Sequence, residues 1–289
     1  MANSLSPRGG ASDVAKIVGR YGGKPTPPEI AYIDEKAIAT YEPYVVPVIW
    51  APEAPTPEAA VVTIDGTRGL FAFNNSGCPR NPAVVQHLKK KIERVRRLGY
   101  SLAVLDELNY PTPHDGELFY SCFCQYCLTH SPRLKMLKKG DLQGLAEVRK
   151  DLVRSVLREV AQYAEGLGLR LEAAVHAPTI AHLAGQDYHT FLRHVDRLQV
   201  MLYRKCPGPA CLNRELAMLA RFGYNPYGID PDAVEKAGVP IRVLKQEAQK
   251  ARELAGERAI PILWADEKLP EAIRAVEEVG FEEVIIFTP

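Results

Sequence analysis

The sequence contains no long apolar run, and none of its stretches approaches the ~20 residues that a helix needs to cross a bilayer. The first ten residues are polar and lack the apolar core of a secretion signal, which predicts a cytoplasmic protein. The formal net charge is only +1, so the composition gives no bias toward nucleic acid or an anionic membrane. We therefore expect neither of these partners.

Cysteine is scarce, and a dinucleotide-binding loop is missing. Six cysteines in 289 residues are too few for a secreted disulfide scaffold. No glycine-rich phosphate loop follows any predicted strand, so we expect no organic cofactor. The content of 46% hydrophobic and 25% charged residues is typical of an ordinary globular protein.

What the sequence does contain is a rhythm of short apolar runs and longer amphipathic segments, which begins near Tyr44. The β-branched content of the runs predicts strands. The predicted strands are Val45–Trp50, Gly69–Asn74, Leu102–Asp106, Leu171–His176, Leu198–Tyr203, Pro240–Leu244, Ile260–Trp264 and Glu283–Phe287. The predicted helices are Pro82–Leu98, Leu142–Leu167, Asp187–Val195, Leu212–Arg221, Gln246–Ala255 and Pro270–Val279.

Eight strands that alternate with helices predict an α/β fold, a (β/α)8 TIM barrel. The barrel is imperfect, because Ala59–Asp65 predicts an extra hairpin strand and Tyr224–Asp230 is irregular. We expect residues 1–40 to form an N-terminal extension or lid and residues 41–289 to form a single domain. An open doubly wound sheet is the alternative fold.

The residues that end the predicted strands are mostly polar or aromatic, and in a barrel they would converge on one rim. Such groups bind sugars or transfer protons. The predicted substrate-binding residues are Trp50, Asn74, Asn75, His176, Tyr203, Arg204 and Trp264. For Arg204, the alternative is an ion pair with Asp106 or Glu107.

Two pairs of adjacent carboxylates are the catalytic candidates. Asp106 and Glu107 end the third predicted strand, and Asp266 and Glu267 follow the seventh. Neighbours on a strand point to opposite faces, so we expect Asp106 to face inward, with Glu107 at the rim or acting as the acid. The structural alternatives are that Asp106 caps a turn beside a solvated Glu107, and that Asp266 caps the helix near Pro270.

Three thiols, Cys122, Cys124 and Cys127, lie within six residues, a spacing that zinc sites use. Cys78 is our first choice for a fourth ligand, and the alternatives are His114, His130 and Cys206. We predict a structural zinc ion, with reduced thiols or disulfides as alternatives. The segment Cys206–Cys211 predicts a local bridge or a second half-site.

At these residues the chain resembles a poorly characterised family of glycoside-hydrolase-like TIM barrels. The matching stretches are Cys78-Pro79-Arg80-Asn81-Pro82, Asp106-Glu107-Leu108-Asn109-Tyr110-Pro111 and Cys122-Phe123-Cys124-Gln125-Tyr126-Cys127. Arg80 stands where the family usually has Asn, and Asn109 where it usually has Arg. The resemblance implies a carbohydrate-active barrel with Asp106 as a key acid.

We therefore expect a glycosidase-like hydrolase that acts on a small-molecule or oligosaccharide substrate through paired carboxylates. One alternative is a metal-dependent hydrolase with a catalytic zinc ion. The other is a carbohydrate-binding barrel without activity, which the Asn109 departure favours.

Overall fold

The computed structural model describes residues 16–21, 47–72, 75–208 and 210–287. Its centre is a sheet of seven parallel strands in the order β1-β9-β8-β7-β6-β5-β2. The strands are β1 (Lys16–Tyr21), β2 (Val48–Trp50), β5 (Leu102–Asp106), β6 (Arg170–His176), β7 (Leu198–Met201), β8 (Ala259–Trp264) and β9 (Glu283–Phe287).

The strand order confirms the α/β class, because each strand from β5 to β9 pairs in parallel with the next one along the chain. The first strand, β1, pairs with the last, β9, as in a barrel. Strands β1 and β2 form the two ends of the order. No hydrogen bond joins residues 16–21 to residues 48–50 in the described part of the chain, so the ring is open at this point.

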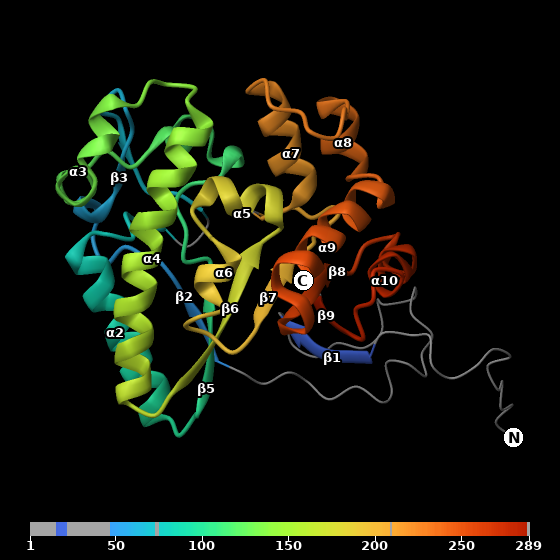
Figure 1. The fold of residues 1–289 in the computed structure, drawn as a ribbon, viewed down its shortest axis with the longest axis horizontal. Coiled ribbons are helices and arrows are strands. Elements are labelled where there is room, and N and C mark those ends of the chain that lie inside the picture. Colours follow the sequence, from blue (N-terminus) through green and yellow to red (C-terminus); the bar gives the residue numbers. More distant parts are fainter. Residues whose placement is uncertain (1–15, 22–46, 73–74, 209, 288–289) are drawn as a thin grey trace, which may run out of the picture.

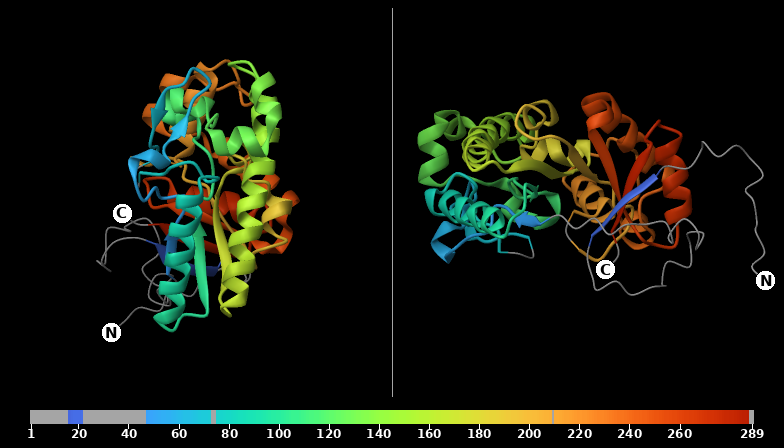
Figure 2. Two further views of the ribbon diagram at one scale, coloured as in Figure 1. Left: turned by 90° about the vertical axis from the view of Figure 1, so that its left-hand side faces the viewer. Right: turned by 90° about the horizontal axis from the view of Figure 1, so that it is seen from below.

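Helices cover one face of the sheet and the region beyond the carboxyl ends of its strands (Figure 1). They are α2 (Pro82–Arg97), α3 (Gln125–His130), α4 (Leu142–Gly166), α5 (Pro178–Ala184), α6 (Tyr188–Phe191), α7 (Leu212–Arg221), α8 (Pro231–Ala237), α9 (Ile241–Ala255) and α10 (Leu269–Glu277). In Figures 1 and 2, α2 and α4 lie beside β5 and β6, while α9 and α10 lie beside β8. Among the helices that the structure describes, none has the length and apolar character needed to traverse a bilayer.

Alternate strand residues face two different cores. Ala103 and Leu105 belong to the large core under the helices, which places Asp106 on the opposite, inner face. A smaller apolar cluster on that inner face includes Tyr203 and Ile262, with Trp264 packed against it. The inner face therefore carries the strand-end residues that the sequence predicted to converge.

Two predicted strands are wrong. Among the described residues of the run Gly69–Asn74, only Gly69 is in a strand: β4 (Arg68–Gly69) pairs antiparallel with β3 (Val61–Val62) outside the main sheet. This pair confirms the extra hairpin predicted at Ala59–Asp65. The run Pro240–Leu244 instead begins helix α9, whose buried residues recur at helical spacing. A short apolar run cannot distinguish a strand from a buried helical turn.

The sequence also left elements unpredicted. Strand β1 lies inside the segment expected to be an extension, and helices α5 and α8 were not foreseen. The helix predicted over Asp187–Val195 is only the four residues of α6. The division into an extension of residues 1–40 and one domain of residues 41–289 stays a prediction.

Candidate active site and thiol cluster

Asp106 is the last residue of β5, and its side chain lies in the inner face with only 9% of the residue exposed. Burial raises the pKa of Asp106 to about 7, because a carboxylate loses its hydration in this environment. No ion pair to Asp106 occurs among the described residues. The Asp106 carboxyl can therefore hold a proton near neutral pH.

Glu107 is buried as well, at 6% exposed, which rules out the solvated alternative. Burial, and then the neighbouring Asp106 charge, raises the pKa of Glu107 well above its ordinary value. The backbone of Glu107 has a φ of 54°, a conformation that non-glycine residues rarely adopt. This turn ends the strand alternation at Glu107, so both carboxyls interact electrostatically with each other and with Tyr203.

A buried network next to these acids was not predicted. The Nδ1 atom of His114 lies 2.7 Å from Oε1 of Glu215, and the Thr112 hydroxyl donates to the same oxygen at 2.6 Å. Burial opposes protonation of His114, but the Glu215 charge outweighs it and raises the pKa of His114 to about 9. For Glu215, burial acts to raise the pKa, but the charge of His114 and its hydrogen bond outweigh burial and lower the pKa. The result is an imidazolium–carboxylate pair.

Glu215 could have been suspected from the sequence, because it falls among the buried apolar residues of α7. A carboxylate on the buried face of an amphipathic helix needs a partner. That partner was out of reach, because His114 is 101 residues away and belongs to the 3₁₀ helix η2 (Pro113–Tyr120). His114 was an alternative fourth ligand for the thiols, but it pairs with Glu215 and does not belong to the thiol group.

His176 ends β6 on the inner face and is 2% exposed. Burial lowers the pKa of His176 to about 4, so its ring is neutral at pH 7. Its Nε2 atom lies 3.5 Å from Nδ2 of Asn109. The Oδ1 atom of Asn109 is buried and has no hydrogen-bond partner among the described residues. This free acceptor beside a neutral imidazole can receive a hydroxyl group of a ligand.

Asp266 and Glu267 occupy a different environment, because Arg204 binds both. Arg204 Nε lies 2.9 Å from Asp266, and Arg204 Nη2 lies 2.5 Å from Glu267. Arg204 therefore pairs with the second carboxylate pair and not with Asp106 or Glu107. Asp266 also accepts a hydrogen bond from the Lys268 N–H at 2.8 Å in the turn before α10. The N-cap of α10 is Lys268, so the alternative that Asp266 caps this helix is wrong.

The second carboxylate pair opens onto a pocket of about 420 Å³, whose wall also includes Trp264 and Lys205. Neither Asp106 nor Glu107 is among the described residues that line it. Tyr203 contacts Trp264 and interacts electrostatically with Asp106 and Glu107. Its ring packs edge-on against Trp264 at 5.7 Å, and burial followed by the Asp106 and Glu107 charges raises the pKa of Tyr203.

Three further residues, Trp50, Asn74 and Asn75, were predicted to bind the substrate. Trp50 is half-buried at the end of β2, and its carbonyl accepts a hydrogen bond from Lys91 at 3.2 Å. Asn75 is exposed in the loop before α2, and its carbonyl accepts a hydrogen bond from the Ala54 N–H. Asn74 lies outside the described residues. The roles of all three stay predictions.

The four thiols of Cys78, Cys122, Cys124 and Cys127 form one buried group, and their Sγ atoms all lie within 4.8 Å of one another. The Sγ atoms of Cys78 and Cys127 are 3.4 Å apart. Four sulfurs around a tetrahedral zinc ion with Zn–S bonds of ~2.3 Å would be separated by roughly 3.8 Å. The cluster could therefore hold a metal ion, and Cys78 is the fourth member that the sequence predicted.

Three segments bring the thiols together. Cys124 is the residue before α3 and Cys127 lies in its first turn. The Val62 N–H of the hairpin strand β3 lies 3.4 Å from the Cys122 sulfur. Cys78 belongs to the loop before α2, and its N–H donates to the carbonyl of Ala59. The cluster therefore lies where α3, the β3 hairpin and the loop before α2 meet.

A buried cation lies beside the thiols. Arg149 of α4 is fully buried, and it donates hydrogen bonds to the carbonyls of Ser121 at 2.9 Å and Pro111 at 3.0 Å. Among the described residues no carboxylate pairs with it. Burial lowers the pKa of Arg149 to about 9, against the opposing charges of groups that include Cys122 and Cys127. Negative charge on the thiols would compensate this cation.

The other two cysteines, Cys206 and Cys211, form a disulfide. This confirms the local bridge and makes the prediction of a second half-site wrong, along with Cys206 as a fourth ligand. The disulfide lies in the loop between β7 and α7, after Tyr203 and Arg204 and before Glu215 of α7.

No family model matches the sequence, and no curated protein matches it. Solved structures with some similarity include the glycoside hydrolase domain of PelA from Pseudomonas aeruginosa. The identity is 13%, the TM-score is 0.47, and 95% of each chain is covered. The glycoside hydrolase domain of PgaB (BpsB) from Bordetella bronchiseptica is 15% identical, with a TM-score of 0.44, and covers 82% of this chain and 69% of its own. Similarity at this level does not establish a function, which has to come from the residues.

Proposed function

We propose that this chain is a glycoside-hydrolase-like enzyme that acts on a small carbohydrate or an oligosaccharide. The supporting observation is the carboxyl of Asp106, which is buried at a strand end without a cation and protonated near neutral pH. A glycosidase needs such a proton donor for the leaving-group oxygen. Asp106 is the acid in this proposal, and Glu107 holds the second buried proton beside it.

The second carboxylate comes from Asp266 or Glu267. The Arg204 guanidinium favours the ionised form of both. Burial outweighs this effect at Asp266 and raises its pKa, while the pKa of Glu267 is lowered, which suits a nucleophile or a general base. Trp264 and Tyr203 would stack on sugar rings, and His176 with Asn109 would bind hydroxyl groups. A separation of ~5–5.5 Å between acid and base predicts retention of configuration, and ~6.5–9.5 Å predicts inversion.

A panel of nitrophenyl glycosides and polysaccharides tests this proposal. We expect wild-type protein to hydrolyse at least one of them, and Asp106→Asn to lose that activity. The matched control is Asp196→Asn, an exposed aspartate that pairs with Arg170. Equal rates for Asp106→Asn and wild type would remove Asp106 from the mechanism.

A carbohydrate-binding barrel without activity is the second candidate, and the Arg204 ion pairs favour it. A carboxylate that is held by a guanidinium is a weaker nucleophile than a free one. Binding of an oligosaccharide by the wild type, with no turnover over days, would support this candidate over the hydrolase.

We propose further that the four-thiol cluster holds zinc in a structural role. Four cysteine ligands fill a tetrahedral zinc ion and leave no open position for a substrate. The adjacent Arg149 charge would offset the net negative charge of such a group. This argues against a metal-dependent hydrolase.

Metal analysis of the purified chain tests the zinc proposal. We expect one zinc ion per chain, which Cys124→Ser loses, while the control Cys206→Ser/Cys211→Ser retains it. Strong chelation should lower thermal stability. If chelation abolished hydrolysis while the fold remained intact, the catalytic-zinc alternative would be favoured.

The cytoplasmic location expected from the polar N-terminus stays a prediction. The Cys206–Cys211 disulfide favours an oxidising compartment instead. Cell fractionation of the native host decides between the two locations.

A further inference from the structure

A second pocket, of about 490 Å³, lies on the outer surface of α4, where the end of α3 and the loop before β7 meet this helix. Arg154 and Arg158 of α4 line it from one side and Arg193 from the other, while the only lining carboxylate among the described residues is Asp151. Three arginines and one aspartate leave this pocket with a net positive charge, whereas the whole chain, with a net charge of +1, is nearly neutral.

Two of these guanidinium groups have no acidic partner. Arg154 forms an ion pair with Asp151. Arg193 donates only to the hydroxyl of Thr190, at 3.0 Å, and no carboxylate pairs with Arg158 or Arg193 among the described residues. Arginines that stabilise a fold usually pair with a carboxylate or a carbonyl, so two unpaired ones in a concave site leave an anion-binding position open.

A fourth guanidinium lies under the pocket. The Nη1 atom of Arg80 donates to the hydroxyl of Ser155 at 3.0 Å, and Ser155 lines the pocket. The Nε atom of Arg80 is buried and has no hydrogen-bond partner among the described residues. A buried N–H donor without an acceptor is costly, and an anion in the pocket would add favourable charge above it.

Two histidines, His130 and His194, also line the pocket and respond to this charge. Burial and then the Arg80 charge lower the pKa of His130. Burial and then the charges of Arg193 and Arg158 lower the pKa of His194. Both rings are therefore neutral at pH 7, and an anion between them would favour their protonated forms.

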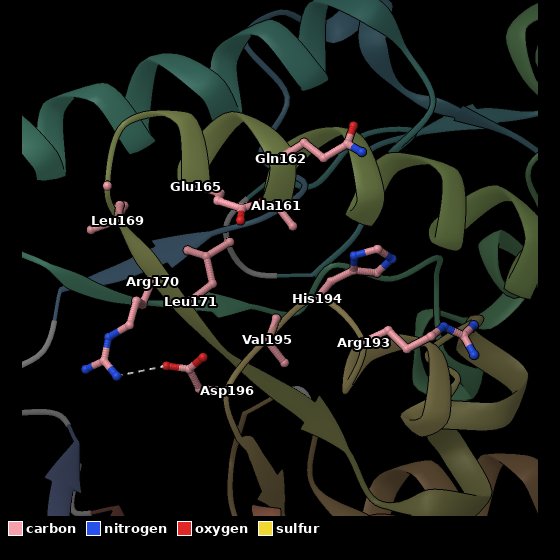
Figure 3. A pocket seen from close by; sticks show the side chains of 11 residues that line it. Ala161, Gln162, Glu165, Leu169, Arg170, Leu171, Arg193, His194, Val195 and Asp196 are labelled. Carbon is pink, nitrogen blue, oxygen red and sulfur yellow. Dashed lines mark ion pairs between the residues drawn. The ribbon is translucent and has the colours of Figure 1, made fainter.

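The arginine side chains separate this pocket from a neighbouring one of about 420 Å³, which shares Arg193 and His194. In the neighbouring pocket the Arg170–Asp196 ion pair, at 3.3 Å, balances the charge. Figure 3 shows Arg193 pointing away from that ion pair. The unpaired positive charge therefore belongs to the pocket on α4.

We propose that this pocket binds an oxyanion of the phosphate or sulfate type, held by Arg158 and Arg193 and completed by Arg154. Guanidinium groups bind such oxyanions with two parallel hydrogen bonds each. The competing interpretation is a solvated basic surface, on which anions act only through ionic strength. The site is independent of the proposed hydrolase activity, because none of its residues belongs to the inner face of the sheet.

Titration of the full-length chain with inorganic phosphate and with sulfate tests the proposal, with chloride at equal ionic strength as the control. Nuclear magnetic resonance of the histidine rings gives the readout. We expect saturable shifts at His130 and His194 and none at His87, which lies beside Glu53. Isothermal calorimetry gives the affinity.

Matched variants separate a site from a surface effect. We expect Arg158→Gln and Arg193→Gln each to weaken phosphate binding about tenfold, Asp151→Asn to strengthen it, and the exposed Arg242→Gln to leave it unchanged. Identical responses to phosphate and chloride, or equal weakening by Arg242→Gln, would overturn the proposal. Since all four positions are on the surface, thermal melting of each variant verifies that it folds.

Discussion

The two carboxylate pairs consist of the same residues in the same order, Asp followed by Glu after a strand, yet their surroundings differ. Asp106 and Glu107 are buried without an ion pair among the described residues, and burial raises the pKa of both. Asp266 and Glu267 share the guanidinium of Arg204. Burial nevertheless raises the pKa of Asp266. For Glu267 burial acts in the same direction, but a backbone hydrogen bond and the Arg204 charge outweigh it and lower the pKa. Protonation is therefore favoured on the first pair, and ionisation is favoured on Glu267 of the second.

This difference shows that the surroundings, and not the residue types, assign the chemical roles. An acid and a base have to differ in pKa to act together at one pH. Burial raises the pKa of Asp106, whereas at Glu267 a backbone hydrogen bond and the Arg204 charge outweigh burial and lower the pKa, so these two residues differ in the required sense.

The largest effect is expected for Asp106→Asn. Loss of a general acid removes proton transfer to the leaving group, so kcat/KM should fall by about 10³-fold on the best substrate of the glycoside panel. The fold should remain, because Asn has nearly the same shape. A substrate with a good leaving group, such as a dinitrophenyl glycoside, should recover part of the rate. A uniform loss on all leaving groups would contradict the acid role.

Arg204→Met should come next and should act on stability. It leaves the carboxylate of Asp266, whose side chain is 6% exposed, without its partner. Breaking a buried ion pair in this way costs about 3–5 kcal/mol of the free energy of unfolding, measured with denaturant. Arg204→Lys, which keeps the charge, should lose less. A cost below about 1 kcal/mol for Arg204→Met would show that the ion pair with Arg204 does not distinguish Asp266 from the unpaired Asp106.

The pH dependence of stability gives a smaller effect. The folded-state pKa of Asp106, about 7, is raised above its unfolded value, so its contribution is fully present at low pH and is lost as pH rises through about 7. Asp106→Asn removes that loss. The variant should gain about 1–3 kcal/mol relative to wild type on going from pH 4 to pH 8. Parallel stability curves for the two proteins would contradict the raised pKa.

The smallest effect is expected for Glu267→Gln. Its side chain is 52% exposed, so solvent screens its ion pair with Arg204. The free energy of unfolding should fall by less than about 1 kcal/mol. Asp266→Asn, which removes the buried ion pair with Arg204, should lower the free energy of unfolding by more. Equal costs would mean that exposure does not decide the strength of these two ion pairs.

Much of the fold was readable from local pattern. Strands β5 and β9 and helix α7 have the bounds that the sequence predicted, because each is a strongly patterned run with clear ends. The pattern gave the wrong element for Pro240–Leu244, because a run of five mostly apolar residues fits a strand and the first turn of a buried helix equally well. Only the packing of α9 against α10 and β8 decides between them.

The site was predictable where sequence spacing carries the geometry. Cys122, Cys124 and Cys127 are near neighbours in the sequence, and Cys78, the first choice for a fourth ligand, joins them from the loop before α2. The His114–Glu215 pair was not predictable, because it depends on how α7 packs against η2. The positive φ at Glu107 was not predictable either, because strand alternation gives no information on the backbone conformation of the residue that follows the strand.

The protonation of Asp106 is the central claim, and carbon-13 nuclear magnetic resonance of its carboxyl measures it without any knowledge of the substrate. Chains labelled at aspartate and glutamate carboxyls, compared with Asp106→Asn to assign the signal, would be titrated from pH 3 to pH 9. Our account predicts that the Asp106 signal titrates near pH 7. A midpoint below pH 5 would contradict it.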